Sequence, residues 1–127
     1  MTPEQAIAEV ARYESELDGI RASFKETRNG IYIARGDEAF YRQYVRELVD
    51  LYNDILGGNS YSAQIAHEFS HGFGSLGSPL LRGVENILAV VRASLTRLRR
   101  NPELLEQKKT QEATRKKENI FLRTYAN

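Results

Sequence analysis

Residues 37–56 limit the fold more than any other part of the chain, because their apolar side chains recur at the spacing of an α-helix. The charged residues Arg46 and Asp50 fall on the opposite side of that helix. Asp37 is expected to cap it, and Gly57-Gly58 to end it. A face this broad must be buried against other helices, so the pattern predicts a core helix of a bundle. The stripe consists of Phe40, Tyr41, Tyr44, Val45, Leu48, Leu51, Tyr52, Ile55 and Leu56.

The first helix has a clear start signal. Thr2 and Gln5 are placed to form a capping box, and Pro3 suits the first helical position. Apolar residues continue at helical spacing, and Asn29-Gly30 is expected to end the helix. The short apolar run Ile31–Ile33 follows. Because three residues cannot build a sheet, we expect this run to be a connector that packs two aliphatic side chains.

Further helices are expected after the glycine pair. One covers about Ser60–His71, and a glycine-rich link leads to another that opens at Ser78-Pro79. Asn101-Pro102 ends that helix and caps a last one. The sequence therefore predicts an all-α fold, an antiparallel bundle of four to five helices whose last helix is long and basic. Residues 1–101 would form the bundle core, and residues 102–127 a basic C-terminal helix that protrudes or docks on a partner.

The composition is that of an ordinary globular chain. Its 127 residues are 41% hydrophobic and 28% charged, which predicts one domain and no membrane span. The absence of cysteine excludes disulfides, thiolate metal sites and a cysteine nucleophile. The first residues lack the basic and apolar regions of a signal peptide, so we expect a cytoplasmic protein without a membrane partner.

Charge is distributed unevenly along the chain. Residues 92–127 hold ten Lys or Arg and four Glu, a net charge of +6, whereas residues 1–91 hold eight Lys or Arg and thirteen Asp or Glu, a net charge of −5. A basic helical tail of this kind can contact nucleic acid or an acidic protein, or can be a solvated helix face. The cations expected to contact a partner are Arg97, Arg99, Arg100, Lys108, Lys109, Arg115, Lys116 and Lys117.

The end of the chain adds an apolar group to this basic region. Residues 106–119 contain a single apolar residue, Ala113, so they cannot bury a face within their own domain. Ile120, Phe121 and Leu122 then follow together. We expect these three side chains to dock on another subunit or on a different protein.

The segment His67-Glu68-Phe69-Ser70-His71 has the form H-E-x-x-H. On a helix, two histidines four residues apart lie on one face and can bind one zinc ion. The segment resembles the zincin metallopeptidases, and this resemblance implies that His67 and His71 bind zinc while Glu68 acts as general base. In the metzincin pattern the third ligand falls at Gly77, which has no side chain. A gluzincin-type third ligand would be Glu85.

A structural interpretation competes with the zinc site. Tyr61, Ile65 and Phe69 share one face of the expected helix, and the two histidines lie nearly opposite, which a solvated polar face would also show. The first hypothesis is therefore a non-enzymatic helical interaction module that needs no cofactor and docks on a protein partner or self-associates. A small zinc hydrolase is the alternative, and nucleic-acid binding through the basic C-terminal helices is the second alternative.

Overall fold

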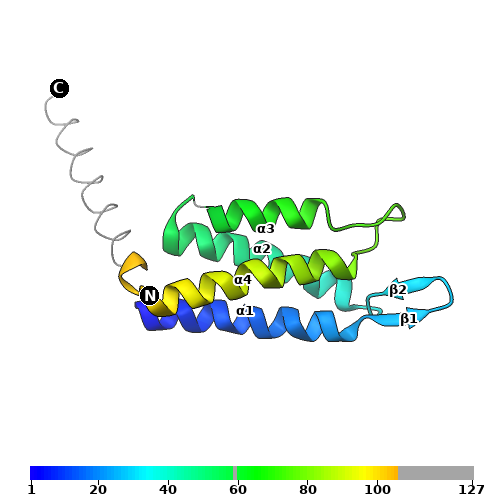
Figure 1. Ribbon diagram of the computed structural model, residues 1–127, viewed down its shortest axis with the longest axis horizontal. Coiled ribbons are helices and arrows are strands. Elements are labelled where there is room, and N and C mark those ends of the chain that lie inside the picture. The colour runs from blue at the N-terminus through cyan, green and yellow to red at the C-terminus, as the bar shows by residue number, and fades with distance from the viewer. Residues whose placement is uncertain (59, 106–127) are drawn as a thin grey trace, which may run out of the picture.

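The computed structural model describes residues 1–58 and 60–105. This part of the chain folds into four antiparallel helices and one small hairpin (Figure 1). Helices α1 and α3 each pack against both α2 and α4, so the helices form a closed ring around one core. The predicted bundle is confirmed for these residues. The elements are α1 (Pro3–Ser23), β1 (Lys25–Thr27), β2 (Gly30–Tyr32), α2 (Asp37–Leu56), α3 (Ser60–Ser70) and α4 (Leu81–Arg100).

The start of α1 has the predicted capping box. The Thr2 amide donates to Gln5 Oε1 at 2.8 Å, and the Gln5 amide donates to Thr2 Oγ1 at 3.1 Å. These two bonds satisfy amides that the first helical turn leaves without a partner. The helix ends at Ser23 rather than at Asn29-Gly30, so the predicted end was wrong by two turns.

The residues after α1 form the hairpin, which corrects the connector prediction. Strands β1 and β2 pair antiparallel, with Thr27 opposite Gly30, whose positive φ of 130° forms part of the turn. Only Ile33 of the apolar run packs against the core, and Ile31 is 50% exposed. The sequence did not show the hairpin because β1 is polar and fully exposed, and therefore carries no alternating pattern.

Two helix starts also differ from the prediction. Gly36, in a left-handed conformation at φ 93°, caps α2, and Asp37 is its first residue rather than its cap. Helix α4 begins at Leu81, because Pro79 is used in a bridge to Phe73 across the glycine-rich link. Both shifts are small, and neither moves the apolar stripe of either helix.

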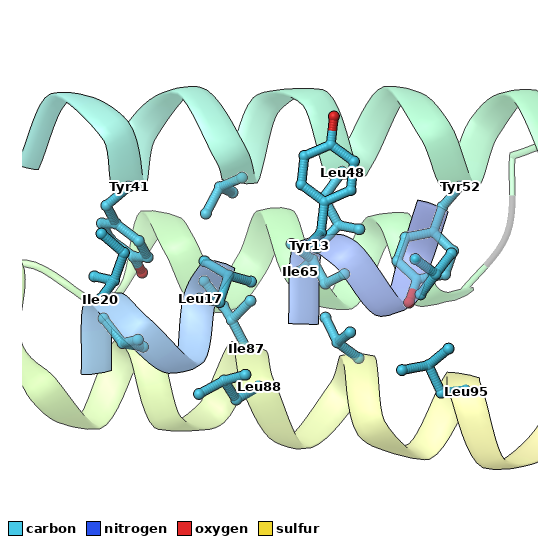
Figure 2. Packing of buried hydrophobic residues seen from close by; sticks show 14 residues of the cluster. Tyr13, Leu17, Ile20, Tyr41, Leu48, Tyr52, Ile65, Ile87, Leu88 and Leu95 are labelled. Atoms are coloured by element: carbon cyan, nitrogen blue, oxygen red, sulfur yellow. The ribbon is translucent and has the colours of Figure 1, made fainter. Parts of the chain in front are cut away.

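The core lies along the inside of the ring, where all four helices contribute (Figure 2). Helix α2 contributes its predicted stripe apart from Phe40, which is 52% exposed, and Tyr41 and Tyr52 are both fully buried. A second cluster joins Ala6, Leu98 and Leu105 at the far end, so burial continues past the expected boundary at residue 101. Within the described ranges, no helix is long and apolar enough to cross a membrane. Of the expected long basic helix, only residues 102–105 are described, and residues 103–105 are helical; residues 106–127 lie outside the described part.

Candidate functional site

The H-E-x-x-H segment lies in the second half of α3 and in the residue that follows it. Ile65 is buried and the two histidines are exposed, which confirms the predicted division of the helix faces. The rings of His67 and His71 lie side by side, tilted by 37° with their centroids 4.3 Å apart. His71 Nδ1 lies 2.9 Å from the carbonyl oxygen of His67 and 3.0 Å from Ser70 Oγ, so these local contacts orient the second ring.

Beside this segment, a polar hollow of about 270 Å³ opens between the end of α3 and the start of α4. Glu68 lines it and accepts a hydrogen bond from Asn86 Nδ2 at 3.1 Å. His71 and Arg82 also line it, whereas His67 and Glu85 do not. Among residues 1–58 and 60–105, no three His, Cys, Asp or Glu side chains gather into a group that could hold a metal ion. The structure thus places the two histidines together but brings no third ligand to them.

Two glycines form the floor of this hollow. A Cβ built on Gly83 would lie 2.8 Å from Gly72 Cα, closer than such atoms ever approach. The backbones of the α3 end and the α4 start therefore touch, and only residues without side chains permit that contact. The glycine-rich link has a packing role here, which its sequence alone did not show.

The predicted basic surface is described only in part. Arg97, Arg99 and Arg100 are exposed in the last turn of α4, and Arg97 Nη1 donates to Tyr61 Oη at 3.3 Å. The other residues expected to bind a partner lie outside the described residues: Lys108, Lys109, Arg115, Lys116, Lys117, Ile120, Phe121 and Leu122.

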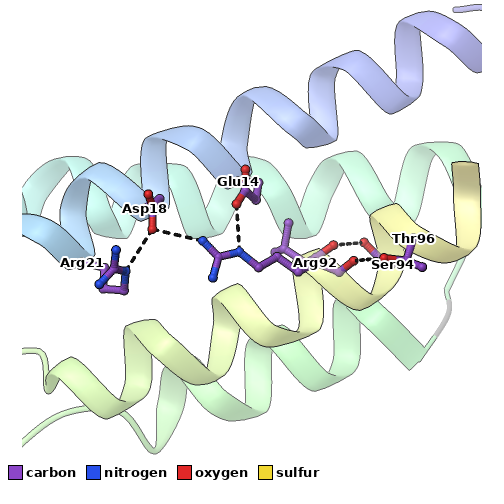
Figure 3. A network of polar contacts seen from close by, with 7 residues as sticks. Glu14, Asp18, Arg21, Arg92, Ser94 and Thr96 are labelled. Carbon is purple, nitrogen blue, oxygen red and sulfur yellow. Dashed lines mark hydrogen bonds and ion pairs between the residues drawn. The ribbon is translucent and has the colours of Figure 1, made fainter.

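A further cation of α4, Arg92, forms ion pairs with α1 of the same chain. Its Nε bonds Glu14 at 2.9 Å and its Nη2 bonds Asp18 at 3.1 Å, both on α1 (Figure 3). Arg21 also bonds Asp18 at 2.9 Å, and its hydrogen bond is the main cause of the lowered pKa of that carboxyl. Arg92 therefore links α4 to two carboxylates on α1.

Sequence reasoning missed a second hollow, which lies between the outer faces of α2 and α3 and has a volume of about 250 Å³. We call it the α2–α3 groove. One edge carries Arg46 and Asp50, whose side chains make no hydrogen bond or ion pair with any described residue. The side chain of Ala66 is short, so it leaves Val49 and Phe69 uncovered, and the floor of the groove is apolar. The lining residues are Arg42, Val45, Arg46, Val49, Asp50, Ala66 and Phe69.

Aromatic packing holds the end of the groove near the hairpin. The ring of Phe69 packs against Tyr41 at 5.6 Å and against Phe73 at 5.0 Å between centroids. The guanidinium of Arg42 lies 4.5 Å over the Phe73 ring and 3.6 Å from Glu38, so it is fixed at the rim. The groove is therefore built on packed helices rather than on loops.

No family model, no curated protein and no solved structure matches this chain.

Proposed function

We propose that the chain is a non-enzymatic helical module that docks on protein, and that the α2–α3 groove is its docking surface. The observation that carries this proposal is the combination of an open apolar floor with two rim charges, Arg46 and Asp50, that no described residue pairs. Covering Val49 and Phe69 would remove apolar surface from water, and the rim charges would set the orientation of the bound partner.

The exposed side of α3 supports the same surface. It carries no charged side chain next to the groove, so a partner would displace water there without desolvating an ion. Depletion of charge at the centre with charges at the rim is typical of protein interfaces. The exposed residues of this side are Ala63, Gln64, Ala66, His67 and Ser70.

The two alternatives rest on fewer observations. A zinc hydrolase has the motif and the neighbouring histidines in its favour, but the described residues supply no third ligand. Nucleic-acid binding has Arg99 and Arg100 exposed together, while Arg92 is already engaged by α1. Docking through Ile120–Leu122 stays a prediction, because those residues lie outside the described part.

The proposal can be tested by oxidative side-chain footprinting of the full chain, in the cells that produce it and as a dilute purified protein. We expect Val49 and Phe69 to be labelled less in cells, because a docked partner shields them from solvent. Ala66→Arg fills the groove with a charged side chain and should restore their labelling.

Ala89→Arg is the matched control, because Ala89 is also an exposed helical alanine but lies on α4 outside the groove lining. It should leave the protection unchanged. Equal labelling of Val49 and Phe69 in cells and in dilute solution would show that nothing docks in the groove, and the proposal would be wrong.

A further inference from the structure

The exposed charges of α2 follow a simple order. Arg42, Arg46, Asp50 and Asp54 are spaced four residues apart, so successive side chains lie about 6 Å apart along the helix on one slanting row. Glu38 lies one step before this row and is paired with Arg42. From Arg42 onward the row carries two positive charges followed by two negative charges. Such a row complements its own reverse, because inverting its direction exchanges the signs at every position.

We infer that the partner in the α2–α3 groove is a second copy of this chain, related by a two-fold axis that crosses α2 between Arg46 and Asp50. This inference rests on the proposed docking function. Each Arg46 would then face Asp50 of the other copy, while Arg42 keeps its ion pair with Glu38 of its own helix. In an isologous interface every contact occurs twice, so this one row supplies two equivalent Arg46–Asp50 pairs.

Charge also explains why a second copy can approach this face. A surface that meets itself brings like charges together unless it is uncharged or its charges alternate about the axis. The exposed side of α3 is uncharged, and the α2 row changes sign across the axis between Arg46 and Asp50, so neither element repels its own copy. The aliphatic stem of Arg46 would cover the floor of the opposite groove at Val49 and Phe69.

Charge reversals provide a test in which the two copies can be changed separately. The full purified chain is examined by sedimentation equilibrium up to about 1 mM, where we expect a dimer. Arg46→Asp or Asp50→Arg alone places like charges opposite each other, and each should weaken dimerisation about tenfold or more. An equimolar mixture of these two variants restores both pairs, so it should form a heterodimer as tight as the parent dimer.

The double variant Arg46→Asp/Asp50→Arg reverses both members of each pair and should also dimerise. Arg35→Asp is the control, because Arg35 is exposed and lies outside the groove. It should dimerise like the parent. Circular dichroism is recorded for every variant to show that the helices are intact.

The outcomes separate this inference from the proposed function. A parent chain that stays monomeric overturns the second-copy inference, whereas protection of Val49 in cells would still support docking of a different protein. A parent dimer that both single variants preserve, or a mixture that fails to associate, places the contact elsewhere and also overturns the inference.

Discussion

Two tyrosines of α2 show how differently a buried hydroxyl can be accommodated. Tyr41 and Tyr52 are both fully buried, and burial raises the pKa of both, that of Tyr52 to about 12. The Tyr52 hydroxyl bonds to Ser94 Oγ, which in turn donates to the carbonyl oxygen of Val91 at 2.7 Å. Within residues 1–58 and 60–105, the Tyr41 hydroxyl has no hydrogen-bond partner. A buried polar group without a partner destabilises the fold.

Phenylalanine substitutions at these two positions should therefore have opposite effects. Tyr41→Phe removes an unsatisfied hydroxyl and should raise the free energy of unfolding by about 1 kcal/mol. Tyr52→Phe removes a hydrogen bond and should lower it by about 1 kcal/mol. Urea unfolding followed by circular dichroism measures both. A loss of stability in Tyr41→Phe would mean that the hydroxyl has a partner in solution.

Two exposed carboxylates make stability depend on acid pH. Hydrogen bonds from Arg21 lower the pKa of Asp18 below its ordinary 3.8, and hydrogen bonds from Gln43 and Tyr13 lower the pKa of Glu47 below its ordinary 4.5. A lowered pKa in the folded state means that the contribution is present above the ordinary value and is lost as the pH falls through the lowered one.

We therefore expect the melting temperature to be steady at mildly acid pH and to fall below about pH 4. Tyr13→Phe removes the 2.8 Å bond to Glu47 Oε2 and should make this fall smaller. Tyr32→Phe is the control, because the Tyr32 hydroxyl bonds a backbone carbonyl instead of a carboxylate. If both variants melt with the parent's pH dependence, the bond from Tyr13 to Glu47 contributes nothing to it.

At the scale of the elements, the contact between Gly72 and Gly83 sets how closely α4 approaches the end of α3. A side chain at either position would force the two backbones apart. Gly19 offers a contrast, because it is exposed near the C-terminal end of α1 and a Cβ there would meet nothing within 4 Å.

The same substitution should thus act in opposite directions at these two sites. Gly83→Ala should lower the free energy of unfolding by about 1–3 kcal/mol through overpacking. Gly19→Ala should raise it by about 1 kcal/mol, since alanine favours the helix. Denaturant titrations of both variants decide the matter. Similar behaviour of the two would show that the backbones do not touch at Gly83.

The elements that were predicted well are those whose side chains repeat. The stripe of α2 and the box at Thr2 follow from local spacing, and both are present. The hairpin was missed because β1 consists of exposed polar residues. Its sequence therefore shows no alternation of apolar and polar side chains. The contact between Gly72 and Gly83 was missed because glycines in a link usually indicate a flexible backbone. Only the packed structure shows that two backbones touch at these glycines.

At the scale of the whole molecule, the sequence indicated the residues of the H-E-x-x-H segment more readily than it indicated the α2–α3 groove. The two histidines of the H-E-x-x-H segment were predicted to lie next to each other on an exposed helix face. They do so because His67 and His71 are four residues apart. The position of Glu85 relative to them depends on how α4 crosses α3, which spacing alone does not determine. The α2–α3 groove likewise exists only where two helices meet, although the charge row from Arg42 was a signal that could have marked one edge.

The arrangement of the four helices also determines where a protein or tag fused ahead of Met1 would lie. Met1 lies beside the end of α4, at the pole of the bundle opposite the hairpin (Figure 1). Arg42, at the rim of the groove, belongs to the early turns of α2 and hence to the hairpin half. A fluorescent protein or an immobilising tag placed ahead of Met1 would thus be held away from that rim, so the molecule can be anchored by its beginning while its recognition surface stays accessible.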